Sequence, residues 1–363
     1  MRLLTTFRMD LHQIPELGFE EFKTQAYLLN VIKDFDCTIH QVQTGLILHF
    51  DHQKERTIAF RADMDALPIQ EATGLPFAST HEGRMHACGH DGHMSILLGL
   101  AHWLNDHYTT LNQNVVLIFQ PSEEKEAGAN VIVDSGILQH LQVEAIFGLH
   151  LWPGKEKSSI WTRANELMAT ASEIDLHITG RAAHVADSEL GIDACHVASK
   201  LLVDAYEMEA ALPKDVFRLL KFGEMHAGTV RNVISDDAKL YGTLRSYDPI
   251  IHQQLKQGLL QIAADHDATF GTTTSMRFLD GYDAVINDPH LVNLVKTSIP
   301  TIRELKKPVL QAEDFGVYRK VCPILFFFLG IGDTAPLHNE KFDFDMDVLE
   351  DGLALFIDIL KAY

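Results

Sequence analysis

Short apolar runs alternate with helical stretches in the first part of the chain, and this alternation limits the possible folds more than any other feature. The runs GLILHF, RTIAFRADMDALP and NVVLIFQPSEE are rich in β-branched and aromatic residues, and a stretch of helical character, Met94 to Asn105, precedes the last of them. A further helix is expected over Phe19–Lys33, where apolar residues recur at helical spacing. Strands that alternate with helices predict an α/β domain with a parallel or mixed sheet.

The pattern changes near residue 170, which predicts a second domain. SEIDLHITG is typical of a strand, Ile192–Ala211 of a helix, and the segment from Met225 to Asp248 of two strands joined by a turn. Later in the chain the pattern of the first part returns, with ILFFFLG as a buried strand. A chain of 363 residues is long enough for two hydrophobic cores. We therefore predict a smaller α+β domain, residues 170–279, inserted into a larger domain formed by residues 1–169 and 280–363.

Charge and composition exclude several classes of protein. Fifty acidic against thirty basic side chains give a net charge of −20, which repels nucleic acid and anionic membrane surfaces. The longest apolar run, Ile324–Leu329, is far shorter than the roughly 20 residues of a membrane helix, and the first twenty residues lack the apolar core of a secretory signal. The four cysteines show no paired spacing. These features predict a soluble cytoplasmic protein that binds neither nucleic acid nor membrane and whose thiols are free to bind metal.

Polar clusters directly follow three of the apolar runs. RADMD, QPSEE and GLH each stand where a predicted strand ends. In α/β sheets, ligands collect beyond the carboxyl ends of the strands, so these clusters are expected to meet at one site. The sequence HACGHDGH adds Cys88 and His90, two residues apart in a glycine-bearing loop, and thiolate with imidazole is a ligand pair for zinc or a neighbouring first-row metal. The alternative for this octapeptide is a solvated histidine-rich loop with a buried cysteine.

Carboxylates at two of these strand ends supply further candidates. Glu123 and Glu124 are adjacent, and at a strand end they face opposite ways, so that one is able to bind metal while the other faces the substrate. The alternative is the acidic start of a helix. Asp63 and Asp65 are candidates for fixing the tautomer of a ligating histidine, with a purely structural turn as the alternative.

Two isolated histidines complete a ligand set. His150 and His338 are each unremarkable alone, because a single histidine after an apolar strand is usually an ordinary buried or solvated side chain. Taken together, however, the candidates provide five ligands at strand ends and leave Glu123 for proton transfer. The five are Cys88, His90, Glu124, His150 and His338. One shared metal site explains them better than five coincidences.

These residues resemble the M20 metallopeptidase family, and in particular its amidohydrolase branch. The resemblance extends over essentially the whole chain. It is carried by LHQIPELGFEEFKTQAYLL, FRADMDALPIQEATGLPFAS, MHACGHDGHM, FQPSEE, GLHLWPG, GRAAHVADSELGIDA, GTVRNVI, GTLR, AEDFG and LHNE. It implies a zinc-peptidase-like catalytic domain with a mixed sheet, and an inserted domain that acts as a lid and forms a homodimer.

The resemblance also implies roles for single residues and a pair of divalent ions, Mn, Zn, Co or Ni. Cys88 resembles the ligand that bridges the two ions, Glu124 and His338 resemble further ligands of one ion, and His90 and His150 those of the other. Glu123 matches the general base, and Asp63 matches an acidic residue of the catalytic machinery. His184, Asn232 and Arg245 match groups that touch the substrate, His184 often in the partner subunit's site.

The implied activity is hydrolysis of an N-acyl amino acid. The opening HQIPELGFEEFKTQAYLL and the segment QEATGLPFAS resemble most closely the N-acetyldiaminopimelate deacetylases of this branch, which implies N-acetyl-L,L-diaminopimelate as substrate and a place in lysine biosynthesis. Hydrolysis of a broader range of N-acyl amino acids, of the hippurate type, is the alternative. A non-catalytic metal-binding protein on the same fold is a second alternative, but it would have no need of Glu123.

Overall fold

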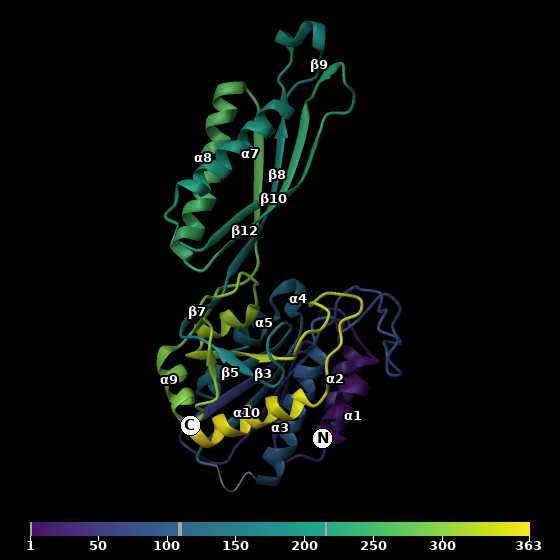
Figure 1. Ribbon diagram of the computed structural model, residues 1–363, viewed down its shortest axis with the longest axis vertical. Helices are drawn as coiled ribbons and strands as arrows, with labels where there is room; N and C mark the ends of the chain where they lie inside the picture. Colours follow the sequence, from purple (N-terminus) through teal and green to yellow (C-terminus); the bar gives the residue numbers. More distant parts are fainter. Residues whose placement is uncertain (1, 108–110, 215) are drawn as a thin grey trace. The chain divides into compact units, whose positions relative to one another are not determined.

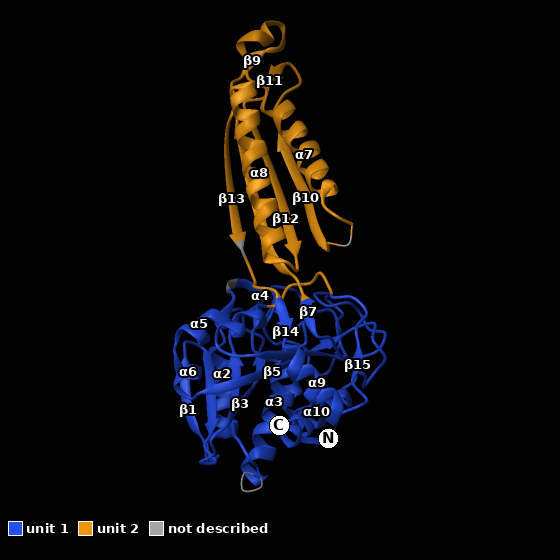
Figure 2. Ribbon diagram, turned by 90° about the vertical axis from the view of Figure 1, so that its left-hand side faces the viewer, with its two compact units in different colours: residues 1–167, 285–308, 314–363 blue, residues 168–284, 309–313 orange. Residues whose placement is uncertain are grey.

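The computed structural model describes residues 2–107, 111–214 and 216–363, and it divides the chain into two compact units. Unit 1 contains residues 1–167, 285–308 and 314–363, and unit 2 contains residues 168–284 and 309–313 (Figure 2). The short return segment 309–313 belongs to unit 2 because hydrogen bonds attach it there: Ala169 N donates to Gln311 O at 3.1 Å, and Arg245 Nη1 donates to Leu310 O at 2.9 Å.

An eight-stranded mixed sheet, which includes the strands labelled β3 and β5 in Figure 1, forms the centre of unit 1. The strand order is β1-β2-β4-β3-β5-β16-β6-β15. Its strands are β1 (Thr38–Val42), β2 (Gly45–Phe50), β3 (Thr57–Asp63), β4 (Asn114–Gln120), β5 (Val143–Trp152), β6 (Ile160–Thr162), β15 (Arg303–Glu304) and β16 (Ile324–Gly330). The neighbours β4, β3, β5 and β16 run parallel, so their carboxyl ends lie at one edge of the sheet. The α/β fold with a mixed sheet, predicted from the alternation of strands and helices, is confirmed. A separate two-stranded ladder pairs β7 (Asn165–Met168) with β14 (Val285–Asn287).

Helices cover this sheet and complete one hydrophobic core. They are α1 (Arg2–His12), α2 (Phe22–Ile32), α3 (His90–His107), α4 (Glu123–Glu126), α5 (Gly128–Asp134), α6 (Ile137–His140), α9 (Pro289–Ser298) and α10 (Val348–Ala362), with a 3-10 helix at Asp314–Lys320. Alternate residues of the parallel strands, such as Phe60, Phe147 and Phe327, are fully buried with apolar residues of α1, α3 and α10. Because side chains alternate across a strand, the residues between them face the opposite side of the sheet.

Helix α3 begins earlier than its apolar pattern predicted. The predicted stretch starts at Met94, whereas the helix starts at His90, directly after Gly89 with a φ of +85°. The first turn is therefore polar, and a polar first turn gives no periodic signal. Gly92 lets this turn approach β5 closely, since a Cβ there would lie 2.8 Å from the Leu151 side chain. His90 and His93, three residues apart, consequently lie on one side of a helix that starts beside the end of β5.

Unit 2 is a four-stranded antiparallel sheet in the order β10-β12-β8-β13, with two helices packed on one face (Figure 2). Its elements are β8 (Thr170–Thr179), α7 (Ala194–Ala211), β10 (Arg218–Ala227), β12 (Asp237–Ser246), α8 (Pro249–Phe270) and β13 (Thr273–Asp280). Capping defines both helices: Asp193 accepts from two amides at the start of α7, and Asp248 does the same for α8, where Pro249 occupies the first position. Gly271, with a φ of +76°, ends α8.

One end of unit 2 carries a small two-stranded ladder, in which β9 (Ala183–His184) pairs with β11 (Val233–Ile234). A 3-10 helix, Val185–Leu190, follows β9. The register places His184 opposite Val233, so His184 and Asn232 are neighbours. Both side chains are exposed.

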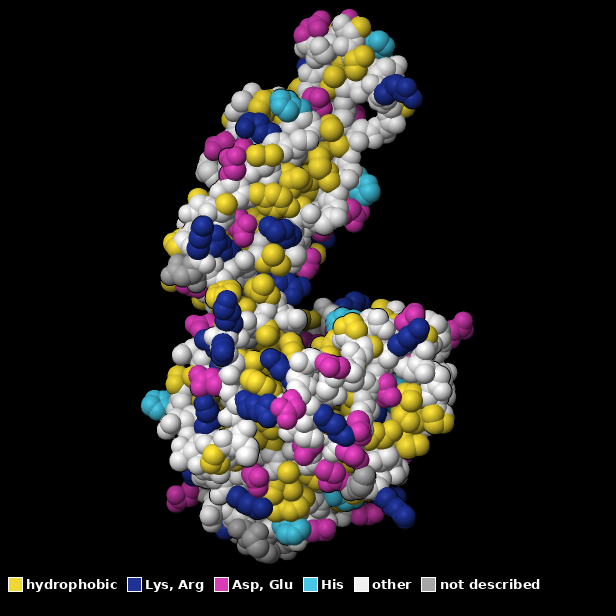
Figure 3. Space-filling view, in the orientation of Figure 1, with side chains coloured by type: hydrophobic (Ala, Val, Ile, Leu, Met, Phe, Trp, Pro, Cys, Tyr) yellow, Lys and Arg dark blue, Asp and Glu magenta, His cyan; other side chains and the backbone are white. Residues whose placement is uncertain are grey.

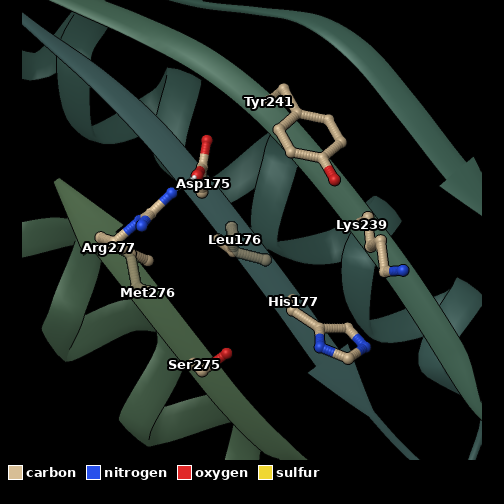
Figure 4. A pocket seen from close by; sticks show the side chains of 8 residues that line it. All are labelled: Asp175, Leu176, His177, Lys239, Tyr241, Ser275, Met276 and Arg277. Atoms are coloured by element: carbon tan, nitrogen blue, oxygen red, sulfur yellow. Dashed lines mark hydrogen bonds and ion pairs between the residues drawn. The ribbon is translucent and has the colours of Figure 1, made fainter. Parts of the chain in front are cut away.

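The face of the unit 2 sheet that the helices do not cover is open and polar. It contains a shallow hollow of about 370 Å³ (Figure 4). Arg277 lies across from Asp175 there and donates to its Oδ2 at 2.7 Å, and Lys239 and Tyr241 extend from β12 beside them. An antiparallel sheet commonly has one solvated face, and this mixture of charges is typical of such a face.

Among the helices in the described ranges, none combines the length and the apolar character that crossing a membrane requires.

Candidate metal centre

The candidate ligands lie at the edge of the unit 1 sheet where the parallel strands end. Asp63 is the last residue of β3, His150 lies near the end of β5, and Glu123 and Glu124 follow β4 after a two-residue turn. His90 starts α3 immediately beyond the Cys88–Gly89 step. The three strand ends that carry the motifs RADMD, QPSEE and GLH therefore do meet in space, as the parallel order of the strands requires.

The two adjacent glutamates do not alternate along a strand, as the sequence had suggested. Strand β4 ends at Gln120, Ser122 adopts the left-handed conformation with a φ of +51°, and both glutamates lie in the first turn of α4. Asp65 holds that turn in place, because its Oδ1 accepts from Glu123 N and its Oδ2 from Glu124 N, each at 3.0 Å. The acidic helix start that was the alternative interpretation is thus the local structure, and it still delivers both carboxylates to the site.

The five predicted ligands come together in two overlapping groups. Within each group the candidate ligand atoms lie within 4.8 Å of one another: one group is Cys88, His90 and His150, and the other is Cys88, Glu124 and His338. The Cys88 Sγ lies 3.4 Å from His150 Nε2. Because Cys88 belongs to both groups, its sulfur is placed where one ligand can serve two ions.

Hydrogen bonds fix which nitrogen of each ligand histidine faces the site. His90 Nδ1 donates to the Asp65 carbonyl at 2.9 Å, and His150 Nδ1 donates to the Leu151 carbonyl at 2.7 Å. A carbonyl oxygen can only accept, so each Nδ1 carries a proton and Nε2 is the nitrogen that each ring offers to the site. Metal-binding histidines are normally oriented in this way.

Two buried atoms of the site have no hydrogen-bond partner in the described part of the chain. They are His90 Nε2 and Glu124 Oε1, which lie 3.8 Å apart. Leaving such atoms unpaired in a protein interior is costly, and a divalent cation between them removes that cost. Together with the thiol and the other imidazoles, these atoms form a donor set that fits zinc or a neighbouring first-row ion.

The pKa values of two candidate ligands, His150 and Cys88, are shifted in opposite directions. Burial, together with the nearby His93 and His90, holds the pKa of His150 well below its usual range, so its ring is neutral and able to coordinate. Burial and the neighbouring Glu124 and Glu123 raise the pKa of the Cys88 thiol well above its usual range. The thiol therefore keeps its proton until a cation replaces it, which makes metal binding release a proton.

His338 reaches the site from a loop near the end of the chain. Its backbone N donates to the Ala87 carbonyl at 2.9 Å, which attaches the loop to the segment that carries Cys88. Its Nε2 lies 3.4 Å from Glu124 Oε1, and its side chain is 53% exposed. The residue has a φ of +63°, which directs the ring of this ligand candidate toward Glu124 at a local conformational cost.

Asp63 lies behind the ligands, in a buried network. Its Oδ2 accepts from Arg61 Nη1 and its Oδ1 from His93 Nδ1, each at 2.6 Å. Arg61 also donates to Asp314 and Gln120. Burial alone would raise the pKa of Asp63, but His90, His93 and Arg61 hold it well below its usual range. Asp63 is therefore an ionised acceptor with both oxygens occupied, and its predicted catalytic role stays a prediction.

Sequence reasoning did not single out His93, Arg61, Gln120 or Asp314. His93 carried a signal, because it stands three residues after His90 and shares a helix face with it once the helix starts at His90. Asp314 belongs to the motif AEDFG, which has no chemical pattern of its own. Its partner Arg61 is 253 residues away in sequence, a separation that no local pattern reveals.

The three predicted substrate-binding residues lie in unit 2 and are not together. His184 and Asn232 are at the β9–β11 ladder, whereas Arg245 is at the far end of β12, next to the return segment 309–313. Arg245 lies eight positions after Asp237 along β12, or about 27 Å at 3.4 Å per residue. Within one copy of unit 2, these residues therefore do not form a single pocket.

A parallel-stranded edge that gathers a thiol, imidazoles and carboxylates around two overlapping centres has the form of a metal-dependent hydrolase. Comparisons with known proteins agree. The profile of peptidase family M20/M25/M40 matches residues 59–362. N-acetyldiaminopimelate deacetylase of Oceanobacillus iheyensis is 34% identical over the whole of both chains. The protein of that name from Lactococcus lactis subsp. cremoris is 35% identical over 96% of this chain and 95% of its own.

Solved structures share the fold over nearly the whole chain. A putative aminohydrolase from methicillin-resistant Staphylococcus aureus has a TM-score of 0.93 at 27% identity, covering 100% of this chain and 96% of its own. The Bacillus subtilis YXEP protein, described as a dinuclear metal-binding peptidase, has a TM-score of 0.85 at 30% identity, covering 98% of this chain and 96% of its own. The chain belongs to peptidase family M20/M25/M40, and it is a metal-dependent amidohydrolase.

Proposed function

We propose that this amidohydrolase cleaves N-acetyl-L,L-diaminopimelate to acetate and L,L-diaminopimelate, a step of lysine biosynthesis. The observation that carries the choice of substrate is the full-length similarity, at 34–35% identity, to proteins named N-acetyldiaminopimelate deacetylase. The observation that carries the chemistry is the pair of overlapping ligand groups with Glu123 beside them.

The ligand groups assign a binding role to five side chains. Cys88 would bridge two divalent ions, Glu124 and His338 would hold one of them, and His90 and His150 the other. Mn, Zn, Co and Ni all accept this mixture of donors. Such ions, when bound, supply acidity to water and polarise an amide carbonyl.

Glu123 would do the proton transfer. Its backbone is fixed by Asp65, and its carboxylate lies within 4.8 Å of the ligand atoms of His90 and Glu124. In that position it can take a proton from the attacking water and return it to the departing amine, which completes hydrolysis without a covalent acyl-enzyme. A protein that only bound metal would gain nothing from a second, adjacent carboxylate.

Unit 2 would act as a lid and as the dimerisation domain. Of the large hydrophobic side chains that are exposed in the described residues, eleven of thirteen belong to unit 2, and only Leu3 and Phe22 belong to unit 1. Figure 3 shows hydrophobic side chains coming to the surface along this unit. Exposed apolar area on one domain is typical of an association surface.

The separation of His184 from Arg245 supports a role of His184 in the partner subunit's site. We expect that mixing inactive His184→Ala subunits with inactive Glu123→Gln subunits restores activity, because each mixed dimer of a two-fold pair has one complete site. Random exchange at equal amounts makes half of the dimers mixed, which predicts about a quarter of the wild-type activity. Steady-state turnover after proven subunit exchange is the measurement.

The matched control mixes Glu123→Gln with Glu124→Gln subunits, which damage the same site and should stay inactive. Absence of activity in the first mixture, or full activity of a monomer, would show that His184 works within its own chain or not at all.

The substrate is tested by comparing kcat/KM for N-acetyl-L,L-diaminopimelate, hippurate and N-acetylmethionine with the same metal-loaded protein. We expect the diaminopimelate derivative to be preferred. A preference for hippurate or N-acetylmethionine would reject the proposed substrate while leaving the amidohydrolase chemistry unchanged.

A further inference from the structure

One of the two strands that pair with β5 ends before β5 does, close to the candidate metal centre. Strand β3 pairs with β5 only as far as the partners Arg61 and Gly148, whereas β16 continues beside β5 to Trp152. The last residues of β5 therefore lack a strand on one side. A buried backbone N–H on that side needs another acceptor. The Leu151 N–H finds it in the side chain of His93, whose Nε2 lies 3.0 Å away.

The hydrogen bonds of His93 leave only one arrangement of its proton. A backbone N–H can only donate, so Nε2 must accept and carries no proton. The other nitrogen, Nδ1, lies 2.6 Å from Asp63 Oδ1. The proton of the ring is therefore on Nδ1 and is donated to Asp63, whose other oxygen accepts from Arg61 Nη1 at 2.6 Å. Leu151 and Asp63 together thus fix the orientation of the His93 ring and the tautomer it adopts.

The same leucine connects His93 to a candidate ligand. The Leu151 N–H donates to His93 Nε2 at 3.0 Å, and the Leu151 carbonyl accepts from His150 Nδ1 at 2.7 Å. The rings of His93 and His150 also touch edge to face, with centroids 4.6 Å apart at 68°. Both the strand end that carries His150 and the ring plane of His150 therefore depend on His93.

We propose that His93 is a positioning residue that aims His150 Nε2 at its metal ion, and that Asp63 acts through His93 rather than on the substrate. This inference rests on the proposed metal centre. His93 replaces the missing strand by holding Leu151, Asp63 fixes the tautomer that makes this possible, and Arg61 fixes Asp63. Packing supports the arrangement, since Gly92 brings the first turn of α3 against the Leu151 side chain.

A competing interpretation makes His93 a metal ligand. Asp63, His90 and His93 form a group whose ligand atoms lie within 4.8 Å of one another. However, the lone pair of His93 Nε2 is used by Leu151 N–H, and both oxygens of Asp63 accept hydrogen bonds at 2.6 Å. Binding a metal to His93 and Asp63 would break at least two of these buried hydrogen bonds. We therefore assign these two residues to holding the ligand His150 in place rather than to binding the ion.

The test compares His93→Gln with His93→Asn. The two replacements have the same amide, but only the longer glutamine reaches the position of Nε2 and can accept from Leu151 N–H. The metal-free proteins are titrated with Co²⁺, and visible absorption, including the sulfur-to-cobalt band of Cys88, gives the dissociation constants of the two ions. We expect His93→Asn to keep one ion at nearly wild-type affinity and to bind the other about 10- to 100-fold more weakly, and His93→Gln to recover much of this loss.

The matched control is His102→Phe, a histidine of the same helix whose ring stacks on Phe7 away from the ligands. It should bind both ions as the wild type does. Equal affinities in His93→Asn and His93→Gln, or an equal loss at both ions in His93→Asn, would overturn the inference. Because no substrate is used, a wild-type protein that binds two ions without hydrolysing N-acyl amino acids would reject the proposed function and leave the inference intact.

Discussion

Replacement of Glu123 by Gln is expected to reduce turnover by about 10²- to 10⁴-fold while the metal content stays close to that of the wild type. The amide keeps the shape of the side chain but cannot accept the proton from water. Asp65 continues to hold the first turn of α4, because it binds the backbone N–H groups of Glu123 and Glu124 and not their side chains. Steady-state kinetics combined with metal analysis of the purified variant measure both effects.

The neighbouring carboxylate is the matched control for this change. Glu124→Gln removes a candidate ligand whose Oε1 lies 3.8 Å from His90 Nε2 and 3.4 Å from His338 Nε2. We expect this variant to lose metal as well as activity. If Glu123→Gln lost metal and Glu124→Gln retained it, the two roles would have to be exchanged.

Replacement of Cys88 by Ala is expected to abolish binding of the metal pair and, with it, activity. The sulfur belongs to both ligand groups, so its loss removes one donor from each ion at once. The thiol itself is buried, with its pKa raised by burial and by Glu124 and Glu123, so metal binding to the wild type should also release a proton that the variant does not release. Isothermal titration in two buffers of different ionisation enthalpy measures the ion count and the released proton together.

A second thiol of unit 1 provides the control for this prediction. Cys322 is partly buried and belongs to none of the ligand groups found in the described residues, so Cys322→Ala should bind two ions per chain. Two ions per chain and normal activity in Cys88→Ala would contradict the bridging role.

The fold and the gathering of ligands were predictable because they follow from local patterns. Strand β4 and the return strand β16 each contain an unbroken apolar run, and a parallel sheet places the polar residues that follow such strands at one edge. Chemistry then restricted the choice among these polar residues. Cys88 with His90 needed only their spacing, and Glu124 with Glu123 only their adjacency.

Local conformation at the site was not predictable from periodicity. Helix α3 starts at His90, directly after Gly89 with its positive φ, and α4 starts at Glu123, where Asp65, two residues beyond the end of β3, accepts from its first amides. The residues that hold the candidate ligands in place could not be predicted from the sequence for a related reason. Arg61 meets Asp314 across 253 residues, and His93 meets Leu151 across 58, through contacts that only the folded chain creates.

The central claim, amide hydrolysis by a pair of ions held at this edge of the sheet, is tested most directly by adding metal back to metal-free protein. The rate of acetate release from N-acetyl-L,L-diaminopimelate is followed while Mn²⁺ or Co²⁺ is titrated in, with the bound ions counted in parallel. Hydrolysis that is absent without metal and reaches its plateau as the second ion per chain binds is the predicted result. Hydrolysis that proceeds at full rate in the metal-free protein, or a chain that takes up no ions, would contradict the claim.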